Sequence, residues 1–161
     1  MAKIRKVSPK YTKGLKKSTA DKRKAEIRKR VKGKVSEKDM YKPLAGDSKA
    51  KTKPSKYTLK LSDLRKQIAE EAGKMKGKQS ERFLKATAKL TGVPKRILEQ
   101  VYNRGLKAWS VGHRPGATQT QWARARIYSF LSGGKTTTTG DADLYKEAKK
   151  IKKDKGGYRL K

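Results

Sequence analysis

The chain has 161 residues, of which 33% are hydrophobic and 37% charged, and its formal net charge at pH 7 is +32. A chain this polar cannot bury a core along its whole length, and its charge predicts an anionic partner such as nucleic acid, acidic protein or an anionic membrane surface. The absence of cysteine excludes disulfides and cysteine-ligated metals. Since no apolar run approaches the length of a membrane span and the first residues lack the apolar core of a signal peptide, we expect a soluble or peripheral protein.

The charge is distributed unevenly along the chain. Residues 1–60 hold 22 Lys and Arg against 5 Asp and Glu, residues 61–145 hold 16 against 7, and residues 146–161 hold 8 against 2. Both ends are therefore more basic per residue than the middle, where a core can form. We predict an extended basic arm over residues 1–60, a helical domain over residues 61–150 and a basic tail over residues 151–161.

The expected arm has few apolar residues to bury. Residues 18–31 could form a helix, but its apolar residues are only Ala25, Ile27 and Val31, so we expect it to form only on a partner. Residues 32–60 place single Tyr, Leu and Met side chains among lysines, glycines and prolines, which is typical of a linker that lies along a surface. The basic runs of the arm could neutralise phosphates or could simply be solvated. Their candidate anion contacts are Arg23, Lys24, Arg28 and Arg30.

Five helices are predicted in the middle of the chain, because apolar residues recur there at three- and four-residue spacing. Their expected start signals are Ser62, Ser80, Pro94, the Thr118–Gln121 capping box, and Asp141 or Asp143. Glycines at 77, 92 and 133–134 are the expected ends of three of them. No segment alternates with a period of two, so we predict an all-α fold, a small helical bundle of about five helices.

One pair of these helices matches a helix-turn-helix pattern over residues 83–104. Ala88 is the small residue where the helices approach, Gly92 lies in the turn, and Leu98 and Val101 fall where the second helix packs on the first. The alternative is an ordinary helical hairpin. If the pattern is a nucleic-acid reader, its candidate contacts in a major groove are Lys95, Arg96, Gln100, Asn103 and Arg104.

The loop over residues 110–117 contains the only histidine, His113, followed by Arg114. His113 could be a general base or a metal ligand, but no nucleophile or further ligand is evident, so we favour a structural loop in which both side chains bond carbonyls or cap a helix. Trp109 and Trp122 flank this loop. They could stack on bases, but at helical spacing they are more typical of a core, with the indole N–H bonded to a loop carbonyl.

A phosphate-binding loop is not predicted. Gly133-Gly-Lys-Thr136 has the last residues of such a motif, but the earlier glycine, the preceding strand and the following helix are missing. We assign no catalytic, cofactor-binding or metal-binding residue.

Residues 104–130 resemble a module of unknown function in proteins of large double-stranded DNA viruses of algae and protists, and of some marine phages. The resemblance is carried by Gly112-His-Arg-Pro-Gly-Ala-Thr118, then Gln121-Trp-Ala123 and Ala125-Arg126. Pro9-Lys-Tyr-Thr-Lys-Gly-Leu15 and the basic stretch through Arg30 resemble a second element of such proteins. The resemblance implies a viral, virion-associated protein and brings no catalytic residue.

These observations lead to an expected function. We expect a non-enzymatic virion structural protein, a minor capsid or cement protein whose basic arms bind acidic surfaces of other capsid proteins. The alternative is a nucleic-acid-binding or DNA-condensing protein, and an anionic membrane surface is a further possible partner. The expected location is the virion, with the host cytoplasm or nucleus during assembly.

Overall fold

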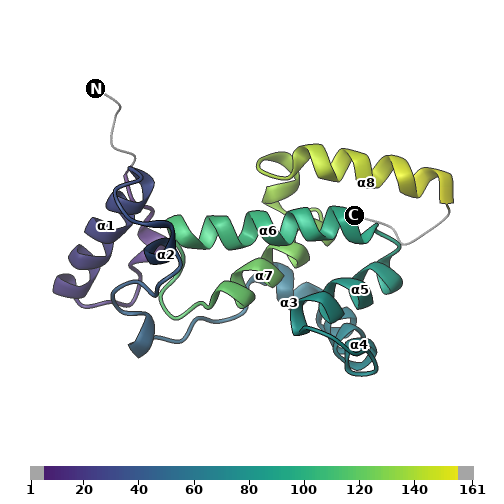
Figure 1. Ribbon diagram of the computed structural model, residues 1–161, viewed down its shortest axis with the longest axis horizontal. Helices are drawn as coiled ribbons and strands as arrows, with labels where there is room; N and C mark the ends of the chain where they lie inside the picture. Colours follow the sequence, from purple (N-terminus) through teal and green to yellow (C-terminus); the bar gives the residue numbers. More distant parts are fainter. Residues whose placement is uncertain (1–5, 156–161) are drawn as a thin grey trace. The chain divides into compact units, whose positions relative to one another are not determined.

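The computed structural model describes residues 6–155, with side chains to residue 151, and this part of the chain is all-α, with eight α-helices and no strand (Figure 1). This is more than the five or so helices expected, because three helices lie within residues 17–60. The expected basic tail starts within the last helix, and from residue 156 on it lies outside the described residues, as do residues 1–5 of the expected arm. The helices are α1 (Lys17–Val31), α2 (Glu37–Met40), α3 (Lys56–Lys60), α4 (Ser62–Gly73), α5 (Gln79–Thr91), α6 (Lys95–Val111), α7 (Gln119–Leu131) and α8 (Ala142–Lys155), with 3-10 turns η1 (Pro9–Tyr11), η2 (Asp47–Lys49) and η3 (Lys135–Thr138).

The chain divides into two compact units, each made of two segments. Unit 1 contains the residues up to Lys53 and Leu106–Trp122, and unit 2 contains Pro54–Gly105 and the residues from Ala123 on. This division differs from the one expected from charge, which separated residues 1–60 from the rest. No helix within residues 6–155 is both long enough and apolar enough to cross a membrane.

In unit 1, α1 has a buried face although its sequence contains few apolar residues. The buried side chains are Ala20, Arg23, Ile27 and Arg30, which are spaced three and four residues apart and therefore lie on one side of the helix. Two of the four are arginines, whose methylene groups can be buried while their guanidinium groups are hydrogen-bonded. A search for apolar periodicity does not count arginine, so the sequence suggested a helix that would form only on a partner.

In unit 2, α4 packs against α5, and most of the large buried side chains are apolar. Phe83 of α5 contacts the rings of Tyr102 and Tyr128 at centroid distances of 6.4 and 6.2 Å. Gly105 of α6 lies against Ala123 of α7, and a Cβ atom at position 105 would come within 2.7 Å of the Ala123 Cα atom. The core of unit 2 is thus the conventional helical packing that the sequence predicted. Its fully buried apolar side chains include Ile97, Leu98, Val101, Ile127, Phe130 and Ala148.

The helix start signals were predicted with mixed success. Helix α6 begins immediately after Pro94, and the Thr118 capping box is confirmed: the Gln121 amide donates to the Thr118 hydroxyl at 3.2 Å and the Thr118 amide to the Gln121 side chain at 3.1 Å. The predictions that Ser62 and Ser80 cap helices were wrong. Ser62 is the first residue of α4 and Ser80 is the second residue of α5, and the residue before each helix makes no side-chain cap.

Two expected helix ends also differ in outcome. Gly92 ends α5 in the left-handed conformation, with φ of +71°, as predicted. Helix α4, however, ends at Gly73 and not near Gly77. The sequence offers two glycines there, and the nearer one ends the helix.

Candidate functional site

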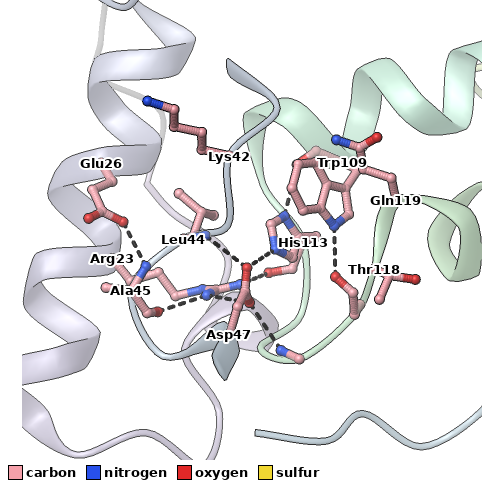
Figure 2. Close-up of polar contacts among 12 residues, drawn as sticks. Arg23, Glu26, Lys42, Leu44, Ala45, Asp47, Trp109, His113, Thr118 and Gln119 are labelled. Atoms are coloured by element: carbon pink, nitrogen blue, oxygen red, sulfur yellow. Dashed lines mark hydrogen bonds and ion pairs between the residues drawn. The ribbon is translucent and has the colours of Figure 1, made fainter. Parts of the chain in front are cut away.

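A buried carboxylate, that of Asp47 in η2, lies between α1 and the loop that joins α6 to α7 (Figure 2). The Asp47 side chain is only 9% exposed and accepts four hydrogen bonds. Arg23 donates at 2.9 Å, the His113 ring at 2.6 Å, the Leu44 amide at 2.8 Å and the Gly116 amide at 3.0 Å. One carboxylate therefore joins α1, the segment before η2 and the loop, all within unit 1.

Arg23 of α1 is the second centre of this network. Its side chain is fully buried, and its guanidinium group donates to the carbonyl oxygens of Ala45 at 2.8 Å and His113 at 2.6 Å as well as to Asp47. These contacts join residues 22 to 90 positions apart in sequence. Arg23 therefore contributes to the packing of unit 1, and its guanidinium group does not face solvent.

Arg30 repeats this arrangement two turns further along α1. It is 6% exposed and donates to the carbonyl oxygens of Met40 at 2.9 Å, Lys42 at 2.7 Å and Ser110 at 3.1 Å. Burial lowers the pKa of its guanidinium group. Arg23 and Arg30 were candidate anion contacts, but in the structure both donate to backbone carbonyls, among them Ser110 near the end of α6 and His113 in the loop after it.

His113 has both ring nitrogens occupied. Its Nδ1 lies 2.9 Å from the Trp109 carbonyl oxygen and its Nε2 lies 2.6 Å from Asp47, while the ring stacks on the Trp109 indole at 4.1 Å between centroids. A carbonyl oxygen and an ionised carboxylate can only accept, so this geometry fits an imidazolium that donates from both nitrogens. In this arrangement the ring has no lone pair for a metal or a substrate proton.

The other residues of the loop motif also have structural explanations. The Trp109 indole N–H donates to the Ala117 carbonyl oxygen at 2.8 Å, so the predicted bond to a loop carbonyl is present. Gly116 has φ of +80°, and a Cβ atom there would lie 2.0 Å from the Ala50 carbonyl oxygen. Only glycine allows the chain at Ala50 to pass so close to the loop. Arg114, by contrast, is exposed.

The pKa of Asp47 gives a testable consequence. Burial alone would raise this pKa, but hydrogen bonds from His113, Leu44 and Gly116 outweigh it and lower the pKa from 3.8 to about 2. Because the folded-state value is below the ordinary one, the stabilisation is complete above about pH 4 and is lost as the pH falls toward the folded-state pKa.

We therefore expect acid to unfold unit 1 between about pH 4 and 2. Both tryptophans belong to unit 1, so their fluorescence reports on it. The midpoint of a urea titration, followed by this fluorescence, should fall across this pH range, and an Asp47→Asn variant should lack this component. A midpoint equally sensitive to pH in both proteins would contradict the role of Asp47.

The remaining candidate contacts in the first 60 residues are on the surface. Lys24 lies 3.5 Å from Asp21 one turn earlier in α1, and Arg28 is exposed. Trp122 is half-buried and its ring lies 6.4 Å from that of Tyr11.

The candidate reading residues of α6 lie in unit 2, and three of them contact acidic side chains. Lys95 lies 3.7 Å from Glu81, and Arg96 lies 2.5 Å from Glu147. Arg104 binds Asp143 through two bonds of 2.8 Å, and these bonds raise the pKa of the guanidinium group. The other two candidates, Gln100 and Asn103, are exposed.

Sequence reasoning missed both buried aspartates. Asp47 was not considered because a single Asp after Gly46 reads as a turn residue. Asp141 or Asp143 was expected to cap the last helix. Asp141 does directly precede α8, but the sequence did not indicate that its fully buried carboxylate accepts from Arg126 at 2.8 and 3.0 Å. No cluster of three His, Cys, Asp or Glu side chains is placed to hold a metal ion in the part of the chain that the structure describes.

Comparison with known proteins gives one match. No curated protein and no solved structure is detectably similar to the chain. A family described as "Family of unknown function (DUF5824)" matches residues 8–149, a range that contains α1, Asp47 and the His113 loop. Because this match covers most of the chain, the protein belongs to the DUF5824 family.

Proposed function

We propose that the protein is a non-enzymatic structural protein of the particle of a large double-stranded DNA virus, a minor capsid or cement protein that binds acidic surfaces of neighbouring capsid proteins. The resemblance of the loop motif and the N-terminal segment to viral proteins supports the viral assignment. The observation that supports a structural role is how unit 1 uses its buried charged side chains. They bind one another and the backbone, so they stabilise the fold of unit 1 and do not form a site for a substrate.

The surface of unit 1 is strongly basic. Residues 6–53 and 106–122 contain 20 Lys and Arg but only 5 Asp and Glu. Of the acidic residues, Asp47 is in the buried network, and Glu26 accepts from the Ala45 amide at 2.8 Å. Most of the other basic side chains of unit 1 are exposed, and in this proposal the anion that they bind is the acidic surface of other capsid proteins.

The location of the protein in purified particles tests this proposal. A protein bound to the shell should remain with empty shells after the genome has been released at moderate salt. Recovery of the protein with the released DNA instead would contradict the proposal and support a DNA-condensing role.

The second candidate function is a DNA reader with a helix-turn-helix over residues 83–104. Exposed Gln100 and Asn103 on α6 favour it, because amide side chains can read adenine edges. The contacts of Lys95, Arg96 and Arg104 with acidic side chains speak against it, because these ion pairs compete with phosphates for the same cations.

Selection from a random DNA pool at about 0.15 M salt distinguishes the two functions. We expect the wild type and the variants Arg96→Ala, Gln100→Ala and Asn103→Ala to bind equally weakly, with no enriched sequence. Specific reading would instead add roughly 1–3 kcal/mol per good base contact. Enrichment of one sequence by the wild type, lost in the Gln100 or Asn103 variant, would replace the capsid proposal with the reader.

A further inference from the structure

The side of α1 that points away from the interior of unit 1 has a regular pattern of charge. Lys17, Lys22, Arg28 and Lys29 are exposed there, whereas the opposite side is buried. We propose that this outward face of α1 is a binding surface for double-helical nucleic acid, which contacts the phosphates of both strands without reading sequence.

The positions of these residues around the helix form two rows. At about 100° per residue, Lys22 and Lys29 lie on one row, and Lys17 and Arg28 lie on another about 120° away. Ser18, Asp21 and Ala25 occupy the strip between them and are also exposed, and Asp21 is ion-paired with Lys24 at 3.5 Å. The outward face of α1 therefore has positive charge along both edges and short side chains along its centre, with Ala25 the smallest of them.

This pattern fits a groove better than a flat acidic surface. The major groove of DNA is about 12 Å wide and admits an α-helix, with a phosphate backbone along each wall. A row of basic residues on each edge of α1 would face one backbone each, and a small central residue would let the helix approach the floor of the groove. A flat acidic protein surface would be matched best by positive charge at the centre of the face.

The buried side of α1 fixes the orientation of this face. Arg23 and Arg30 hold α1 through hydrogen bonds to Asp47 and to backbone carbonyls of unit 1. The exposed basic residues are thus held in place before a ligand binds, which reduces the ordering entropy lost on binding. Three of the four are lysines, which act as point charges toward phosphate, so we expect no base preference.

This inference does not rest on the proposed function, because a capsid protein can bind both its shell and the packaged genome. It also places the nucleic-acid contact on α1 and not on residues 83–104, which the sequence suggested. The two proposals can fail independently. The capsid proposal is tested by whether the protein stays with empty shells after genome release, whereas the binding surface on α1 is tested by the salt dependence of duplex binding.

The first experiment measures the affinity of the full-length protein for a random-sequence DNA duplex as a function of salt. Replacing all four basic residues of the outward face of α1 with Gln should reduce the slope of log affinity against log salt by about 3–4, since each lost phosphate contact removes about 0.9. The matched control removes the same charge from exposed lysines of unit 2: Lys60→Gln, Lys66→Gln, Lys76→Gln and Lys78→Gln. Equal reductions in the two variants would overturn the proposal, because only net charge would then matter.

The second experiment tests the groove. Ala25→Trp changes no charge but places a large side chain on the central strip, so duplex affinity should fall about tenfold, whereas Ala69→Trp on the exposed side of α4 should leave it unchanged. Poly-glutamate is the competing probe. If the four-residue α1 variant loses poly-glutamate affinity as strongly as duplex affinity, and Ala25→Trp affects neither, the outward face of α1 binds acidic protein instead. Unchanged tryptophan fluorescence in the charge variants, and an unchanged thermal midpoint by circular dichroism in Ala25→Trp and Ala69→Trp, which each add a tryptophan, confirm that the variants are folded.

Discussion

Replacing Asp47 with Ala is expected to lower the free energy of unfolding of unit 1 by about 3–5 kcal/mol, the usual effect of removing one partner from a buried ion pair. The variant leaves the buried charges of Arg23 and His113 without their carboxylate, and leaves the Leu44 and Gly116 amides without an acceptor. A domain of fewer than about 70–80 residues rarely has more than about 3–5 kcal/mol of stability to lose. We expect unit 1 to be largely unfolded, as measured by urea titration with tryptophan fluorescence.

The matched control for this variant is Asp21→Ala. Asp21 is also an aspartate of unit 1 with a basic neighbour, Lys24 at 3.5 Å, but its side chain is 59% exposed. Exposed ion pairs contribute about 0–1 kcal/mol, so this variant should remain close to the wild type. Similar urea midpoints for the two variants would show that the Asp47 network does not hold unit 1 together.

The parts of the fold that could be predicted from the sequence depend on local signals. Helix α6 follows Pro94 directly, and α7 follows a capping box whose two hydrogen bonds close within four residues, Thr118 to Gln121. The buried face of α6, which includes Ile97, Val101 and Trp109, has the three- and four-residue spacing of a helix. Such patterns can be recognised in a single sequence because the two interacting residues lie within a few positions of each other.

Unit 1 could not be predicted in this way because its interior is built from distant polar partners. Arg23 binds the carbonyl of His113, which lies 90 residues later, and Asp47 binds the His113 ring 66 residues later. Nothing near Arg23 distinguishes it from the exposed Lys22 beside it. The composition correctly indicated that few apolar residues are available in this part of the chain. Unit 1 folds nevertheless, because buried ion pairs and hydrogen bonds to backbone carbonyls supplement its small apolar core.

Replacing Trp109 with Ala should lower the free energy of unfolding of unit 1 by about 3–5 kcal/mol, whereas Trp122→Ala should have a clearly smaller effect. The sequence predicted equal structural roles for the two. In the structure Trp109 is 3% exposed, stacks on His113 and donates its indole N–H to Ala117, so its loss opens a cavity and removes support from the His113 ring. Trp122 is only half-buried, against Tyr11.

Each of these two variants keeps one tryptophan, so the remaining indole reports the unfolding of unit 1 in both. Trp109→Phe provides the intermediate case, because it restores most of the ring volume but cannot donate to the Ala117 carbonyl, and it should recover more than half of the lost stability. A base-stacking role for the two tryptophans predicts a different result. If both Ala variants melt at the wild-type temperature and lose only nucleic-acid affinity, then the two indoles contact bases, and the buried position of Trp109 does not describe the protein in its bound state.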